Sequence, residues 1–308
     1  MIVLACLCCA FSWTHSAVVP IGGDFGFGLQ SANSWLPFGS VSAVVNVAVN
    51  VVVALLVVYI NRTFNVLRSI TYLVATMFLA MQTSMPMVLG QFYGGSLMSL
   101  LILLCTMLLF SVYADNMGQR RVYLIFLILG AATMTQVAYL FYVPMLLIGC
   151  VQMRVFSLRT CLAAFMGLVT PAWILLGFGI VNISDMQWPE MEVVWSMFDA
   201  ADMVQAFVTV GFTVLMGIVF TVANILKILS YNSRVRAFNG FLTLLLMFTV
   251  IFMLLNFNNF TLYIPLLNVL VAYQVGHFFT YRRQRRSYLA ILMLILAYGG
   301  LFAWSVSA

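Results

Sequence analysis

Residues 41–60 read VSAVVNVAVNVVVALLVVYI, and Asn61 and Arg62 follow them directly. No charged side chain interrupts this apolar run. An α-helix needs about 20 such residues to cross the hydrocarbon core of a bilayer. A basic residue at the end of the run is typical of a cytoplasmic boundary. The stretch therefore predicts a transmembrane helix, and similar runs fill most of the chain.

The composition of the whole chain supports the same class. Of the 308 residues, 65% are hydrophobic and 6% are charged, whereas a soluble domain has about 25% charged residues. So few charges cannot cover a surface that faces water, but they suit one that faces lipid. A membrane β-barrel would instead show alternating segments of about 10 residues. We therefore predict an all-α, polytopic transmembrane bundle in which residues 1–308 form one membrane domain.

Apolar runs separated by polar or glycine-rich connections predict eleven spans. They are residues 1–13, 41–60, 69–90, 96–113, 122–134, 137–153, 160–181, 203–225, 238–256, 260–280 and 287–305. Residues 122–153 are too long for one ordinary span and short for two, so we interpret them as a hairpin that turns near Thr135 and Gln136. Whether residues 1–13 form a full span or a clipped start stays open. The long outer connections are residues 14–40 and 182–202.

The basic residues give the orientation. With the N-terminus in the cytoplasm and the C-terminus outside, all 13 basic residues fall in cytoplasmic connections, as the positive-inside rule expects. The outer connections receive every acidic residue except Asp115. The net charge of +6 thus reflects topology, and no basic surface interleaved with aromatic residues suggests nucleic-acid binding. The strongest basic cluster is predicted to anchor the last span at anionic lipid headgroups. It comprises Arg282, Arg283, Arg285 and Arg286.

Two short motifs suggest an internal repeat. Residues 142–146 read YVPML and residues 263–267 read YIPLL. Each lies near the outer end of a span that runs inward, where proline is accepted in the first helical turn. This similarity predicts that spans five to seven and nine to eleven are parallel repeats, as occur in transporters and other polytopic folds.

Three segments resemble a group of uncharacterised multi-span inner-membrane proteins from Bacteroidota. They are NRTFNVLRSITYLVATMFLAMQ (61–82), FYGGSLMSLLILLC (92–105) and FYVPMLLIGCVQMRVFSLRTCLAAFMGLVTPAWILLGFGI (141–180). The resemblance rests on general patterns over much of the chain. It implies a multi-pass protein of the cytoplasmic (inner) membrane in a bacterium with two membranes. It brings no known activity and therefore no functional residue.

Polar residues inside the predicted spans are candidate site residues. No charged residue falls within a span, although intramembrane charges usually mark function. Asn46 and Asn50 are one helical turn apart and share a face. We favour hydrogen bonding between helices over lining of a substrate path, and we expect His277 at the interface. The polar candidates are Asn46, Asn50, Gln82, Asn268 and Gln274, with Gln136, Gln205, Asn224 and His277 beside them.

Asp24, in the first outer loop, is a candidate catalytic base. Multi-span glycosyltransferases that use polyprenyl-linked substrates carry an acidic residue in such a loop, where it could deprotonate an acceptor hydroxyl. The favoured alternative is that Asp24 satisfies a glycine-rich turn after Gly22 and Gly23.

The loop 182–202, NISDMQWPEMEVVWSMFDAAD, holds most of the acidic residues of the chain. Asp185, Glu190 and Glu192 are candidates for binding a cation or a substrate, and Glu192 is a second catalytic candidate. The favoured alternative is an interfacial helix anchored by two tryptophans. In a helix over 188–198, Glu192 would share the tryptophan face, so we expect it to face the protein.

Two function classes remain open. The first is handling of a lipid-linked envelope precursor, as a glycosyltransferase-like enzyme or a flippase-like protein, which the outer acids and uncharged spans indicate. The second is a non-catalytic membrane subunit or scaffold of an envelope complex, because catalytic motifs are absent. A small-solute transporter ranks third, because no intramembrane charge is present. Expected partners are membrane lipids with a polyprenyl-linked substrate or an envelope-complex protein. The six cysteines behave as small apolar residues, and no metal or cofactor is predicted.

Overall fold

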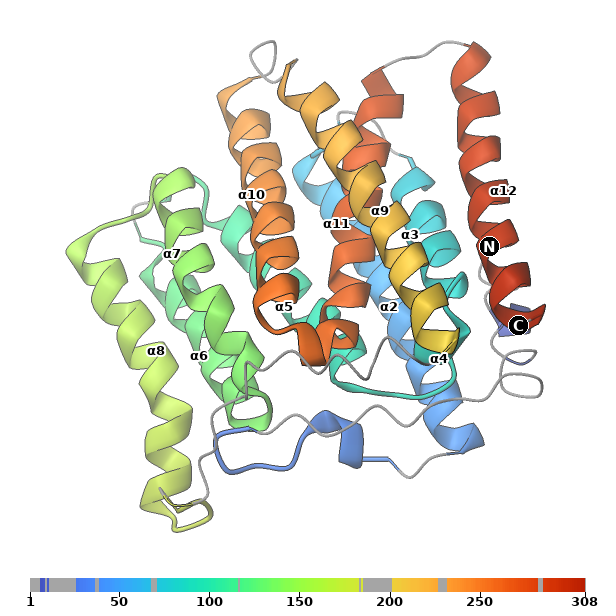
Figure 1. The fold of residues 1–308 in the computed structure, drawn as a ribbon. Helices are drawn as coiled ribbons and strands as arrows, with labels where there is room; N and C mark the ends of the chain where they lie inside the picture. Colours follow the sequence, from blue (N-terminus) through green and yellow to red (C-terminus); the bar gives the residue numbers. More distant parts are fainter. Residues whose placement is uncertain are drawn as a thin grey trace.

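A computed structural model describes the chain apart from residues 1–5, 9, 11–25, 37–38, 68–70, 116, 183, 185–200, 227–231, 282–284 and 308. Its regular elements are helices (Figure 1). In chain order they are η1 (Ala32–Ser34), α2 (Ser40–Phe64), α3 (Leu73–Thr83), α4 (Pro86–Leu89), α5 (Gly94–Ser111), α6 (Gln119–Thr135), η2 (Val137–Phe141), α7 (Tyr142–Gln152), α8 (Leu158–Gly177), α9 (Ala201–Ile225), α10 (Ser233–Leu255), η6 (Phe257–Asn259), α11 (Phe260–Tyr281) and α12 (Arg285–Ser307). The predicted all-α bundle is confirmed.

Seven of the described helices are long and apolar enough to cross a membrane. They are α2, α5, α8, α9, α10, α11 and α12. The protein is therefore a polytopic membrane protein. Every predicted span from 41–60 onward coincides with a helix or a broken helix, but most of residues 1–13 lie outside the described residues. The count of eleven spans and their orientation stay predictions.

Helix α11 forms the centre of the bundle. It contacts α3, α5, α9 and α10. Of its most apolar 18-residue stretch, 94% is buried inside the protein. Helices α8 and α12 lie at opposite edges of the bundle (Figure 1). Of their corresponding apolar stretches, only 17% in α8 and 6% in α12 is buried.

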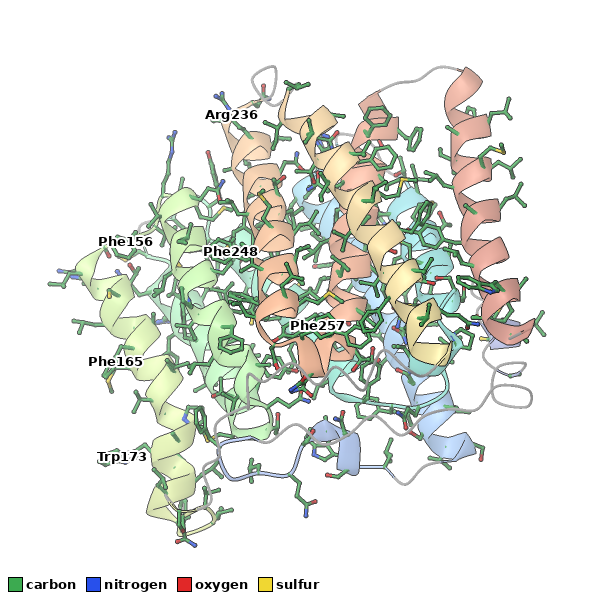
Figure 2. The ribbon with its side chains drawn as sticks, viewed as in Figure 1. Phe156, Phe165, Trp173, Arg236, Phe248 and Phe257 are labelled. Atoms are coloured by element: carbon green, nitrogen blue, oxygen red, sulfur yellow. The ribbon has the colours of Figure 1, made fainter. Side chains whose placement is uncertain are left out.

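The chain direction of the later helices sorts their ends to two sides of the bundle. The C-terminal ends of α9 and α11 and the N-terminal ends of α10 and α12 lie at one end of the bundle, at the top of Figure 1. Figure 2 shows Arg236 at this end. The α10–α11 connection lies at the opposite end. Arg236 and the connection between α10 and α11 therefore lie at opposite ends of the bundle, and the side of the membrane that each end faces stays a prediction.

The turn predicted near Thr135 and Gln136 is confirmed. Helix α6 ends at Thr135, and Gln136 is extended with φ −152° and ψ 122°, so the chain leaves the helix before η2 and α7. Helix α6 packs closely on α8. A Cβ on Gly130 would lie 2.5 Å from the carbonyl oxygen of Leu168, and one on Gly167 would lie 2.5 Å from that of Tyr123. Small residues allow this close approach of two backbones in a membrane.

The predicted span 69–90 is not one continuous helix. Helix α3 ends at Thr83, and α4 begins at Pro86 for a single turn. Proline lacks an N–H and its ring clashes with the preceding turn of a helix, but the first helical position tolerates both. Ser84, Val88 and Tyr93 are buried. The chain therefore breaks its helical hydrogen bonding inside the protein.

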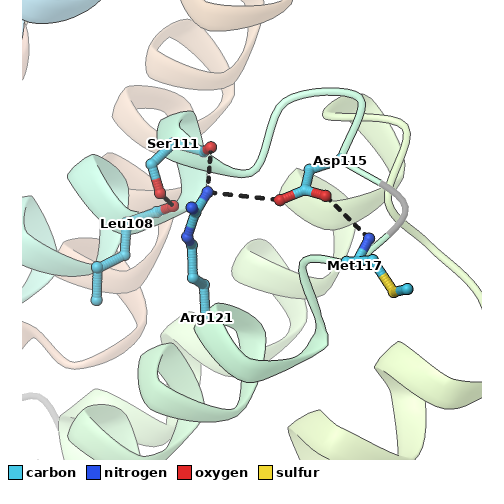
Figure 3. Close-up of polar contacts among 5 residues, drawn as sticks. All are labelled: Leu108, Ser111, Asp115, Met117 and Arg121. Carbon is cyan, nitrogen blue, oxygen red and sulfur yellow. Dashed lines mark hydrogen bonds and ion pairs between the residues drawn. The ribbon is translucent and has the colours of Figure 1, made fainter.

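The connection between α5 and α6 explains why Asp115 lies among basic residues (Figure 3). Arg121 Nη1 lies 3.5 Å from Asp115 Oδ2 and donates to the carbonyl oxygen of Ser111 at 2.7 Å. Asp115 Oδ1 accepts from the Met117 N–H at 2.9 Å. Both charged side chains are well exposed, so the ion pair contributes about 1 kcal/mol or less. Its role is to close this turn at the end of α5.

The predicted repeat extends only to the motifs. Pro144 lies in the first turn of α7, whereas Pro265 lies deeper inside α11. Helix α8 packs along α6, whereas α12 contacts α3, α4 and α9. The third helices of the two proposed units therefore pack differently, and a common ancestry of the units stays a prediction.

Candidate functional site

Five buried polar residues lie on four packed helices and form what we call the amide cluster. It comprises Asn46 and Asn50 of α2, Gln82 of α3, Ser96 of α5 and Asn268 of α11. The helices contact one another in the cyclic order α2, α3, α11, α5. No member is more than 2% exposed, so each polar atom depends on partners inside the protein.

Asn46 supports the broken backbone beside it. Its Nδ2 donates to the carbonyl oxygens of Val88 and Leu89 at 3.0 and 2.8 Å. Its Oδ1 accepts from Ser96 Oγ at 2.5 Å. One turn earlier on α2, Ser42 Oγ accepts the Phe92 N–H at 2.8 Å. Irregular backbone in a membrane protein requires such partners, and α2 supplies them.

Asn50 is left with an acceptor that no described residue satisfies. Its Nδ2 donates to the backbone carbonyl of Asn46 at 3.0 Å and lies 3.3 Å from Asn46 Oδ1. Because a backbone carbonyl only accepts, these contacts fix the orientation of the amide. Among the described residues, Asn50 Oδ1 has no hydrogen-bond partner. A buried acceptor in this state costs about 1–3 kcal/mol.

Gln82 presents a second polar atom without a described partner. Asn268 Nδ2 donates to Gln82 Oε1 at 3.0 Å, and Gln82 Nε2 has no partner in the described part of the chain. Both side chains are amides, so exchanging oxygen and nitrogen in both preserves the bond. The unpaired amide atom of Gln82 is therefore either a donor or an acceptor, depending on the group that contacts it.

Two other buried amides, Asn224 of α9 and Gln274 of α11, are paired with each other. Asn224 Nδ2 donates to the backbone oxygen and to Oε1 of Gln274, both at 2.9 Å. Gln274 Nε2 donates to Thr243 Oγ1 at 3.1 Å. These contacts tie α11 to α9 and α10, so the favoured interpretation of hydrogen bonding between helices describes Gln274 well.

The expected position of His277 at the membrane interface stays a prediction, but its side chain has partners inside the protein. His277 is buried, and its Nε2 lies 2.8 Å from Asn239 Nδ2. Asn239 Nδ2 also lies 3.4 Å from the carbonyl oxygen of Val66, which fixes that amide as the donor. The imidazole Nε2 therefore accepts, as in a neutral histidine. Its proximity in sequence to the basic cluster suggested the interface, whereas its place on the central helix decides its burial.

A segment that we call the outer strap, residues 26–36, joins the ends of α5 and α6. The N–H groups of Phe27 and Leu29 donate to the carbonyl oxygens of Thr133 and Met134 at 3.3 and 3.1 Å. Asn33 Oδ1 accepts the Gly94 N–H at 2.7 Å. Sequence reasoning treated this segment as a glycine-rich loop and missed these contacts.

Gln136 lies under the outer strap. Its Nε2 donates to Ser31 Oγ at 3.4 Å, and its Oε1 has no partner among the described residues. The glycines of this segment are the sequence feature that could have indicated its close contacts. A Cβ on Gly26 would overlap the Met134 carbonyl, and Gly28 has φ +97°, a conformation that glycine adopts readily.

The buried polar side chains in the described part of the chain are Ser, Thr, Asn, Gln and one His. The same residues contain no group of three or more His, Cys, Asp or Glu side chains that could hold a metal ion. The predicted sites at Asp24, Asp185, Glu190 and Glu192 lie outside the described residues, as do Arg282 and Arg283. Arg285 and Arg286 begin α12. The polar side chains that the described core could present to a ligand are therefore uncharged.

No family model and no curated protein matches this chain.

Proposed function

We propose that the protein is a flippase-like carrier in the cytoplasmic membrane of a two-membrane bacterium, where it passes the uncharged polar head of a lipid-linked envelope precursor through the bilayer. One observation supports this proposal above the others. The amide cluster combines unsatisfied, uncharged polar atoms at Asn50 and Gln82 with a broken helix, all buried among four helices.

The physical argument concerns what polar atoms do inside a membrane protein. An unsatisfied polar group there costs free energy, and broken helices often line substrate sites in transporters. Carboxylate and ammonium substrates need opposite charges, which the described core does not offer. Hydroxyl and amide groups of a sugar need only neutral hydrogen-bond partners, which asparagine and glutamine provide.

The carrier form of the lipid-precursor hypothesis is preferred over the enzyme form. The described buried polar side chains are hydroxyls, amides and one imidazole, which suit binding of a neutral head, whereas the enzyme form requires Asp24 or Glu192 as a base. The enzyme form has its own test, because Glu192→Gln would abolish a transferase activity while leaving the protein folded and inserted. Transfer of sugar heads that survives Glu192→Gln unchanged would instead favour the carrier form.

Reconstitution tests the carrier directly. Vesicles containing the purified protein and a radiolabelled glucosyl diacylglycerol, a lipid-linked sugar whose head is uncharged, are treated with periodate, which oxidises only sugars on the outside. Protein-free vesicles should protect the inner half of the sugar. Vesicles with the protein should expose that half within minutes. Continued protection by a folded, correctly inserted protein would contradict the proposal.

A scaffold function has one observation in its favour. Helix α8 turns large apolar side chains away from its partner α6, and Trp173 is 76% exposed. Figure 2 shows Phe165 and Trp173 on the outward side of α8. A photo-crosslinking amino acid at position 173 would separate the alternatives in native membranes. One stoichiometric protein adduct would favour a subunit of a complex, whereas adducts to lipid alone would count against it.

A further inference from the structure

We propose that Asn50 and Gln82 bind a hydroxyl group of a neutral sugar head, with Asn50 Oδ1 as the acceptor for its proton. The inference deepens the proposed carrier function, and rests on it, by assigning the contact that selects the substrate.

Asn50 determines which kind of ligand group can bind. Its Nδ2 faces the backbone carbonyl of Asn46, so Oδ1 is the atom that remains, and it accepts only. The side chain is 2% exposed, so bulk water does not satisfy it. A ligand at this atom must bring a hydrogen-bond donor.

Gln82 defines the chemistry further. It lies on α3, which packs against α2, and its side chain is 1% exposed with one amide atom unpaired among the described residues. With Asn268 donating to Oε1, that atom is the Nε2 donor, and exchanging oxygen and nitrogen in both amides would make it an acceptor. A hydroxyl both donates and accepts. A hydroxyl therefore suits Asn50 Oδ1 by donating and suits the free amide atom of Gln82 in either orientation, whereas a phosphate that only accepts does not suit Asn50 Oδ1.

Buried amides in this protein differ in whether they are paired, and Gln136 Oε1 and Gln152 Oε1 also have no partner among the described residues. Asn224 and Gln274 are buried to a similar degree and satisfy one another. Asn46 uses its Nδ2 on α4 and its Oδ1 on Ser96. Unpaired amide atoms occur at Asn50 and Gln82 within the amide cluster, next to the break between α3 and α4.

Water and a sugar hydroxyl share this chemistry, so the experiment separates them. The purified protein in lipid nanodiscs is titrated with octyl β-glucoside and, in parallel, with an octyl tetraethylene glycol methyl ether that has no hydroxyl. Binding is followed by native mass spectrometry and by the thermal unfolding midpoint. We expect the glucoside to bind and raise the midpoint, and the ether to do neither.

The variants Asn50→Leu and Asn50→Ala should each weaken glucoside binding about tenfold, the loss of roughly one hydrogen bond. Asn224→Leu is the matched control. It should lower the unfolding midpoint in the absence of probe and leave the midpoint increase caused by glucoside intact. Asn50→Ala provides a smaller substitution should Asn50→Leu fail to fold.

Two outcomes would overturn the inference. If Asn50→Leu raises the midpoint and the wild-type protein binds no glucoside, Asn50 is a strained amide without a ligand. If Asn50→Ala and Asn50→Leu lower the midpoint without any dependence on glucoside, the site holds water. Periodate exposure of sugar that is equal in wild type and Asn50→Leu would sustain the carrier and refute this site. Binding through Asn50 without transfer would sustain the site and refute the carrier.

Discussion

Asn46→Ala should be among the most destabilising single substitutions in the described core. The change removes the side chain that joins α2 to α4 and α5 by hydrogen bonds to Val88, Leu89 and Ser96. If each bond contributes the average of about 0.6 kcal/mol found between membrane helices, the loss is about 2 kcal/mol. If the three stranded groups instead each cost about 1–3 kcal/mol, the loss reaches about 5 kcal/mol or more. We expect a value between these limits.

Reversible unfolding in mixed micelles would measure this loss, and hydrogen exchange would locate it. The amides of residues 84–93 should exchange faster in Asn46→Ala, while those in the middle of α10 should not change. Asn239→Ala, which removes a smaller set of contacts on α10, is the control for loss of a buried amide elsewhere. A loss below about 1 kcal/mol, or unchanged exchange over 84–93, would refute the role given to Asn46.

Three further outcomes are expected. In a cysteine-free background, a cysteine within 183–200 should react with a membrane-impermeant thiol reagent from outside and one within 282–286 should not; the opposite labelling would reverse the orientation. Neutralising the four arginines of 282–286 should disturb insertion of the last span most, since each contributes about 1 kcal/mol near anionic headgroups; an unchanged location of the C-terminus would contradict this. Gly167→Val should separate α6 from α8 and lower the unfolding midpoint, because its Cβ would lie 2.5 Å from the Tyr123 carbonyl oxygen; Gly177→Val, where a Cβ has nothing within 4 Å, should leave that contact unchanged.

Sequence patterns predicted the elements well because length and charge act locally. Twenty apolar residues before Arg62 specify α2 whatever packs against it, and the turn at Gln136 followed from counting residues between arginines. The shared face of Asn46 and Asn50 followed from helical periodicity alone. These features depend on the bilayer and on the helix itself, so no knowledge of neighbours was needed.

The order of the helices could not be predicted in this way. Lipid and protein interior are both apolar, so apolarity does not decide whether a helix lies at the centre or the edge. Helix α11 is central although it carries Asn268, Gln274 and His277, whereas α12 is peripheral. Pro86 indicated a kink in its span, but the partners that stabilise the break, Ser42 and Asn46, lie on another helix and could not be predicted. Both features are decided by tertiary contacts.

The central position of α11 has a consequence for how the protein is made. Asn268 is translated 186 residues after its partner Gln82, and Tyr273 is translated 216 residues after Val57, whose carbonyl it hydrogen-bonds. At a translation rate of about 5–20 residues per second, roughly 10–40 s pass between synthesis of the earlier helices and synthesis of α11, which they surround. During that interval Gln82 has no α11 beside it. The central helix is therefore made after most of the helices that surround it, and any factor that shields polar side chains such as Gln82 during insertion acts on the nascent chain before residue 260 is made.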